Sequence, residues 1–335
     1  MSLDIILPLK GQRVKEVERV RRIFFLTLAM LLCTAGMALA AVRLQPERAP
    51  TGDGDRVLTV LIDGERKETT MAEYLPGVVA AEMPASFEPE ALKAQAVAAR
   101  TYILQRSTHR APAHPEADVC SDPGCCCAYR SEAALREQWG KEYRKNLRKI
   151  RAAVSATEGQ AMTYEGEPIL AAFHSASLGQ TESSAALWGA LPYLVSVSTP
   201  ETAEDVPNLQ TEVTLSPEAL RAALTAHDET AALPEDPAAW APAITPDAAG
   251  RVETITIGGV TLTGAQARDA FQLRSTHFTV AYRDGAFVFT VQGSGRGVGM
   301  SQYGANVMAQ SGAGYKEILA HYYPGTALEN TPAVY

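Results

Sequence analysis

One carboxylic acid stands on a helical face that is otherwise apolar. Positions i, i+3, i+4 and i+7 of this face are Leu75, Val78, Val79 and Glu82. Such a face packs against the core, so we predict that the Glu82 carboxyl is partly desolvated and that its pKa is raised. A carboxyl group that keeps its proton near neutral pH can serve as a general acid. A structural glutamate paired with a nearby base such as Lys93 or Arg100 explains the same pattern, and helical spacing alone favours neither interpretation.

A histidine and a group of cysteines have the chemistry of a metal site. His114, Cys120 and Cys126 follow one another with five residues between neighbours. Imidazole and thiolate are good zinc ligands, and an irregular segment lets them converge. Cys125 and Cys127 crowd the same segment. Disulfide pairing in an oxidising compartment is therefore an alternative on spacing alone.

Two polar loops are candidates for ligand binding. One follows an expected strand at 168–174, so its side chains can project into a cleft. The other is the glycine-rich segment 293–299, whose backbone can approach a ligand closely. It lacks the Lys-Ser or Lys-Thr pair that follows the glycines of a P-loop, which excludes a nucleotide site there.

Helical and strand patterns along the chain predict an α+β domain. A capping box at Thr70 and Glu73 opens the first helix, and Pro84 ends it. Further helices are expected over 89–102, 131–157 and 301–310. Strands are expected over 57–63, 160–164, 168–174, 252–263 and 278–292. The helix over 131–157 is charged and is expected mostly to face solvent, and 200–290 is expected to form a smaller lobe.

The start of the chain has the charge pattern of a membrane anchor. Basic residues are frequent in 1–22, and the uncharged run 23–42 is long enough to span a bilayer, which takes about 20 residues. We predict a cytoplasmic tail, a transmembrane helix, a linker over 43–56 and an extracytoplasmic domain over 57–335. A cleaved signal peptide is the alternative, because Ala38-Leu39-Ala40 resembles a cleavage site. The net charge of -8 argues against a nucleic-acid partner.

Two segments carry the most specific motifs of the chain, GVVAAEMP at 77–84 and EALKAQAVAARTY at 90–102. They resemble the signature of the SpoIID family, which includes the LytB-type amidase enhancers. The family's further motifs resemble FHSAS at 173–177, GRGVGMSQYGAN at 295–306 and HYYPGT at 321–326. The sequence departs from the pattern at Leu178, where the family usually has Gly, and at Arg296, where His is common.

The resemblance implies roles for individual residues. Glu82 would be the catalytic acid, with Lys93 and Arg100 lining the substrate cleft. Substrate contacts are also implied for His174, Ser175, Ser177, Arg296, Gly297, Ser301, Gln302 and Tyr303. A zinc ion is implied at His114, Cys120 and Cys126. We interpret this zinc as structural, and a catalytic zinc with an open water position is the alternative.

The resemblance also implies a function and a setting. The expected protein is a membrane-anchored lytic transglycosylase with a single α+β domain of the SpoIID type. It would cleave the bond between MurNAc and GlcNAc in peptide-stripped peptidoglycan strands and leave 1,6-anhydroMurNAc ends. Expected partners are an amidase and a membrane protein of the machinery that engulfs the forespore, at the mother-cell membrane. A non-catalytic, LytB-like wall-binding module that enhances an amidase is the alternative.

Overall fold

The computed structural model describes residues 53–330. The predicted tail over 1–22, the membrane segment over 23–42 and most of the linker lie outside this range. Within it, every helix is too short or too polar to cross a bilayer. The described residues combine helices with small sheets, which confirms the predicted α+β class.

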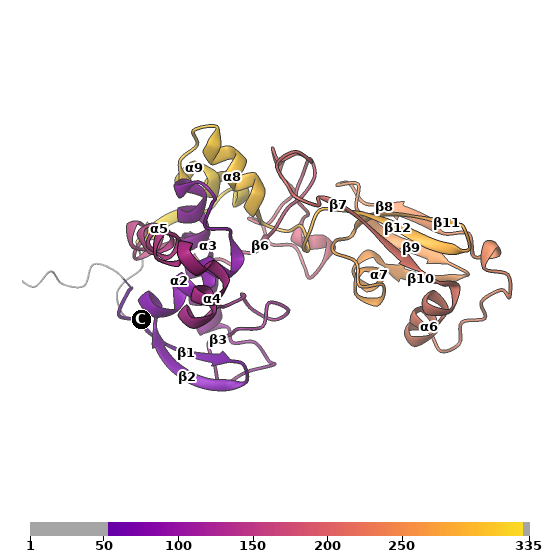
Figure 1. Ribbon diagram of the computed structural model, residues 1–335, viewed down its shortest axis with the longest axis horizontal. Coiled ribbons are helices and arrows are strands. Elements are labelled where there is room, and N and C mark those ends of the chain that lie inside the picture. Colours follow the sequence, from indigo (N-terminus) through magenta and orange to yellow (C-terminus); the bar gives the residue numbers. More distant parts are fainter. Residues whose placement is uncertain (1–52, 331–335) are drawn as a thin grey trace, which may run out of the picture. The chain divides into compact units, whose positions relative to one another are not determined.

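Helix α3 (Pro89–Thr108) is the centre of the helical part (Figure 1). All five of its alanines are completely buried, and a side chain that ends at Cβ lets neighbouring elements approach closely. Its neighbours are α2 (Met71–Glu82), α5 (Tyr143–Ala156), α8 (Gln302–Gln310), α9 (Tyr315–Tyr322) and β4 (Gln160–Tyr164). The main hydrophobic core forms where these elements meet.

Helix α2 has the boundaries that its sequence predicts. The Thr70 hydroxyl accepts from the Glu73 N–H, and the Glu73 carboxylate accepts from the Thr70 N–H, which completes the capping box. Pro76 lies inside the helix without ending it. The helix ends at Glu82, because Met83 is extended and Pro84 follows it.

Short sheets connect segments that are distant in sequence. Strand β1 (Val57–Ile62) pairs antiparallel with β2 (Glu65–Thr70) and parallel with β3 (Val119–Cys120). Strand β4 lies between β14 (Ala327–Asn330) and β5 (Glu167–Pro168). Strand β6 (Phe173–His174) pairs parallel with β13 (Met300–Ser301), so the two predicted ligand-binding loops lie side by side.

The structure corrects two predicted elements. The helix predicted over 131–157 is divided into α4 (Glu132–Trp139), a short 3-10 turn η1 (Gly140–Glu142) and α5. Gly140 has φ +48°, a conformation that side chains with a Cβ rarely adopt. The strand predicted over 168–174 consists only of β5 and β6, and the segment between them is irregular.

Residues 200–290 contain two antiparallel three-stranded sheets. In the first sheet, β12 (Ala286–Gln292) lies between β11 (His277–Arg283) and β7 (Gln210–Leu215). In the second, β9 (Val252–Ile257) lies between β10 (Val260–Thr263) and β8 (Ala243–Pro246). Helices α6 (Pro217–His227) and α7 (Gly264–Ala270) complete this segment. It has a hydrophobic core of its own, in which Trp240 stacks on Phe287 with ring centroids 5.3 Å apart.

Candidate active-site cleft and metal cluster

Glu82 is the last residue of α2 and is half-buried. Its Oε1 accepts a hydrogen bond of 2.6 Å from the Ala128 N–H, and the Gln302 side chain also bonds to the carboxyl group. Burial raises the pKa of Glu82, and these two hydrogen bonds oppose the shift without cancelling it. The predicted direction of the pKa shift is therefore confirmed, and the environment suits a proton donor.

The two bases that could have neutralised Glu82 are bonded elsewhere. Lys93 Nζ lies 2.6 Å from Glu90 Oε1, and Arg100 Nε lies 3.2 Å from Asp53 Oδ2. Within residues 53–330, Glu82 forms no ion pair. The interpretation of Glu82 as the acid of a buried structural pair with Lys93 or Arg100 is therefore wrong.

Glu82 opens into a cleft of about 690 Å³. Three residues predicted to contact substrate line it: Ser175 after β6, and Gln302 and Tyr303 at the start of α8. A further wall comes from α4 and α5, including Trp139 and Lys149. The cleft thus brings together the Glu82 carboxyl group, hydroxyl and amide side chains, and aromatic rings.

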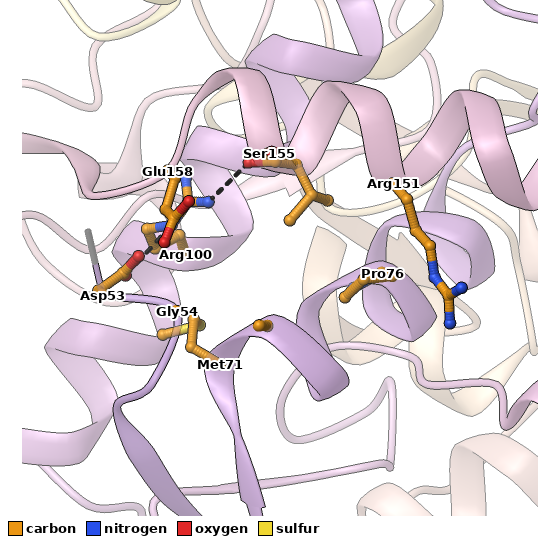
Figure 2. A pocket seen from close by; sticks show the side chains of 10 residues that line it. Asp53, Gly54, Met71, Pro76, Arg100, Arg151, Ser155 and Glu158 are labelled. Carbon is orange, nitrogen blue, oxygen red and sulfur yellow. Dashed lines mark hydrogen bonds and ion pairs between the residues drawn. The ribbon is translucent and has the colours of Figure 1, made fainter. Parts of the chain in front are cut away.

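Arg100 lines a different cavity, of about 240 Å³, together with Asp53 and Glu158 (Figure 2). Arg100 and Asp53 are each 1% exposed. The guanidinium also donates to the carbonyl oxygens of Val154 and Gln160. Arg100 therefore ties α3 to the end of α5 and to β4, and the structure does not bring it to the cleft. Lys93 also lies outside the cleft lining.

His174 and Ser177 are buried and bonded to protein groups. His174 Nε2 lies 2.6 Å from Ser177 Oγ, and Nδ1 lies 3.2 Å from the Val298 carbonyl oxygen. Burial, helped by the Arg251 charge, lowers the pKa of His174 to about 3, so the ring is neutral at physiological pH. Neither residue lines the cleft; both hold the loop that presents Ser175 to it.

Arg251 completes this buried network. Its guanidinium donates to Ser177 Oγ over 2.9 Å and lies 3.8 Å from Glu182 Oε2. Gly297 leaves room for it, because a Cβ at Gly297 would lie 2.5 Å from the Arg251 guanidinium. The glycine-rich loop is therefore shaped by close packing around Arg251.

The two other predicted ligand-binding residues differ in exposure. Ser301 is fully buried at the start of α8, where its hydroxyl donates to Glu201 Oε1 and accepts from the Gly304 N–H. Glu201 Oε1 also accepts from the Ser177 N–H, so this carboxylate joins both loops. Arg296 is exposed and lies outside the cleft lining.

The metal cluster has four candidate ligands. The ligand atoms of His114, Cys120, Cys125 and Cys126 all lie within 4.8 Å of one another. His114 Nδ1 lies 3.3 Å from the Ala117 carbonyl oxygen, while Nε2 lies 3.2 Å from Cys126 Sγ. Nδ1 is thus oriented by the backbone and Nε2 faces the thiols, as in many zinc sites. Three sulfurs and one imidazole form a common zinc donor set.

The cysteines of the described residues are free, so the disulfide alternative is not what the structure shows. Cys127 is outside the cluster and packs in the main core. The next residue, Ala128, donates to Glu82. The segment 125–128 thus connects the metal cluster directly to the candidate acid.

Sequence patterns missed Arg251, Glu201 and Trp139, and left the role of Cys125 open. Arg251 and Glu201 stand in a segment without a recognisable motif, and only tertiary structure brings them to the loops. Trp139 comes directly before the helix break at Gly140. The glycine was the one feature of the sequence that could have drawn attention to Trp139.

Comparisons with known proteins give matches over most of the chain. The family model described as "Stage II sporulation protein" matches residues 64–164, which include Glu82 and the metal cluster. Stage II sporulation protein D of Bacillus amyloliquefaciens is 40% identical over 260 residues, covering 76% of this chain and 73% of that protein. Its counterpart in Bacillus subtilis (strain 168) is 38% identical over 266 residues, covering 78% and 75%.

A more distant relative is the amidase enhancer of Bacillus subtilis (strain 168). It is 27% identical over 313 residues, which cover 76% of this chain and 40% of that protein. The identity with both sporulation proteins extends over most of each chain, so the chain belongs to the stage II sporulation protein D (SpoIID) family.

Proposed function

We propose that this protein is a lytic transglycosylase that cleaves the MurNAc–GlcNAc bond of peptidoglycan glycan strands. The observation that carries the proposal is the isolation of Glu82, the one carboxylic acid among the described residues that line the cleft. Hydrolases of glycosidic bonds ordinarily use two carboxyl groups. One suffices when a hydroxyl of the substrate itself replaces water as the nucleophile.

The reaction then needs one proton to leave Glu82 and one to return. Protonated Glu82 donates to the glycosidic oxygen, the bond from MurNAc C1 to that oxygen breaks, and GlcNAc leaves as an alcohol. The Ala128 N–H and the Gln302 side chain stabilise the resulting carboxylate. The carboxylate takes the proton of the MurNAc O6 hydroxyl as O6 closes on C1. The product is a 1,6-anhydro sugar, and no water is consumed.

A structural zinc fits the cluster next to this site. His114, Cys120, Cys125 and Cys126 would hold it, and four protein ligands leave no open position for a water molecule. When bound, the ion supplies a rigid cross-link. These four residues would thereby fix the segment that delivers the Ala128 N–H to Glu82.

Family membership supports the setting that we propose for this activity. The substrate would be glycan strands stripped of stem peptides by an amidase partner, at the mother-cell membrane during engulfment of the forespore. The segment 23–42 would anchor the protein there, next to a membrane partner.

The proposal is tested with full-length protein and peptide-stripped glycan strands. Mass spectrometry should detect anhydroMurNAc ends with wild type and with Glu88→Gln, a control at an exposed carboxylate outside the cleft lining. The Glu82→Gln variant should be folded and at least about 1,000-fold slower, since the loss of an essential acid costs several kcal/mol of transition-state stabilisation. Full activity of Glu82→Gln would disprove the mechanism.

A second candidate is favoured by the match to the amidase enhancer. A non-catalytic module would bind glycan strands and stimulate an amidase, but would release no anhydro ends by itself. Wild type that binds strands and leaves them uncut would establish this alternative.

A further inference from the structure

One wall of the cleft comes from α4 and α5 and is not part of any family-like motif. It presents Gln138 and Trp139 from the end of α4, and Lys145, Asn146 and Lys149 from the first half of α5. The turn η1 separates the two segments, and both line the same cleft. The charged residues of this region, expected mostly to face solvent, therefore include two that face the cleft.

The positive charges of the two lysines on this wall are only weakly neutralised by nearby carboxylates. Lys149 Nζ donates to the carbonyl oxygens of Ser86 and Phe87, and it forms no ion pair within residues 53–330. Lys145 pairs only with Glu142, over 3.1 Å, and the two side chains are 82% and 60% exposed. Such an exposed pair contributes little to stability and is easily exchanged for a ligand.

The charge of the cleft is thus opposite to that of the whole chain. The protein carries a net charge of -8, whereas the cleft lining has two lysines and one carboxyl group, Glu82. Glu82 is held toward its neutral form by burial. A local positive potential in an acidic protein attracts an anionic group on the ligand, which a neutral oligosaccharide would not need.

Trp139 provides the surface for a sugar ring between these charges. It is half-buried, and it lies in the same cleft lining as the partly exposed Tyr303. The flat C–H face of a pyranose packs well on an aromatic ring, and nearby amides can bond its hydroxyl groups. Gln138 and Asn146 supply such amides.

We propose that Trp139, Lys145 and Lys149 form a subsite for a pyranose that bears a free carboxylate. The inference rests on the proposed function and specifies its substrate. In a strand that carries stem peptides, the lactyl group of MurNAc is an amide and is neutral at that point. Removal of the peptide by hydrolysis leaves a lactyl carboxylate. The two lysines would therefore select the stripped strand.

The test uses two glycan oligomers that differ only at the lactyl group, one with the free carboxylate and one with the primary amide. Their dissociation constants are measured with full-length protein in the Glu82→Gln background, so that no turnover interferes. The background protein should bind the carboxylate about three- to tenfold more tightly, as expected for two solvent-accessible ion pairs. The preference should decrease as salt rises.

Variants in the same background separate charge from stacking. Lys145→Gln with Lys149→Gln should bring the ratio of the two dissociation constants close to one, and the matching double change to Arg should restore it. Trp139→Ala should weaken both ligands equally. Lys141→Gln, an exposed control on the intervening turn, should leave the ratio unchanged.

Two outcomes would overturn the subsite. One is an equal affinity of the background protein for carboxylate and amide, and the other is an undiminished preference after both lysines are replaced. Neither outcome affects the release of anhydro ends by wild type, which tests the proposed function separately. Conversely, wild type without lytic activity but with the charge preference would leave the subsite in place as part of a binding module.

Discussion

At the scale of single residues, the environment of Glu82 decides the chemistry. A carboxyl group that is half-buried, bonded by two donors and free of ion pairs keeps its proton to higher pH than an exposed glutamate. In the proposed mechanism, the same two donors would stabilise the charged form that the first proton transfer leaves. The site therefore accommodates both the neutral and the charged form of the Glu82 carboxyl group.

We expect lytic activity to be lost on the alkaline side of the Glu82 pKa. The proposed reaction begins from protonated Glu82, so the rate should fall about tenfold per pH unit above that pKa, which lies higher than the ordinary 4.5. Gln302→Met removes a donor to the carboxylate and should move this decline to still higher pH. The check is the pH profile of kcat/KM, with Gln310→Met at the exposed end of α8 as the control.

Sequence patterns located this acid but not its surroundings. Helical spacing alone placed Glu82 on a buried face, because the period of a helix is a local property. Arg100 and His174 were expected at the cleft from family-like motifs. In the structure both residues are buried: Arg100 pairs with Asp53, and His174 bonds to Ser177. A motif marks residues that matter, but does not distinguish contact with substrate from support of the loops.

At the scale of elements, the segment 125–128 connects the candidate metal cluster to the end of α2. The candidate ligands Cys125 and Cys126 lie two to three residues before Ala128, whose N–H bonds to Glu82. Any loosening of the segment should therefore reach the acid through the backbone.

We expect purified protein to contain about one zinc ion per chain. Cys125→Ser should weaken zinc binding at least about tenfold, because it removes one of four ligands. Cys127→Ser should keep the metal, since that buried thiol is outside the cluster. Metal analysis and chelator titration check both variants. Equal zinc affinity in Cys125→Ser and wild type would remove Cys125 from the ligand set.

The boundaries of elements were predictable where they depend on local chemistry. The capping box of Thr70 and Glu73 and the stop at Pro84 are of this kind. Strand β2 was not predicted, because its sequence ERKETT lacks apolar alternation and it is defined by pairing with β1. The break at Gly140 was missed because glycine is tolerated within helices and its positive φ cannot be derived from composition.

At the scale of the whole molecule, residues from the segment over 200–290 stabilise the loops around the cleft. Arg251 bonds to Ser177 and lies next to Glu182, and Glu201 joins Ser177 to Ser301. Burial, together with the neighbouring Asp247 carboxyl, raises the pKa of Glu182 to about 7. The folded protein therefore holds a proton near Arg251 under conditions in which the unfolded chain has released it.

This proton predicts a pH dependence of stability. Between about pH 4.5 and 7 the folded state binds more protons at Glu182 than the unfolded state, so the free energy of unfolding should fall as pH rises through this window. After allowance for solvent screening, the change should be on the order of 1–2 kcal/mol. Denaturant unfolding at several pH values measures it. Glu182→Gln should flatten the slope; an equal slope in wild type and variant would assign the proton to another group.

The central claim is that Glu82 drives ring closure by a substrate hydroxyl and not attack by water. Digestion of stripped glycan strands in water enriched in oxygen-18, followed by mass spectrometry of the new MurNAc ends, tests it most directly. We predict anhydro ends that contain no heavy oxygen. New reducing ends that carry oxygen-18 at C1, dependent on Glu82, would show hydrolysis and contradict the mechanism.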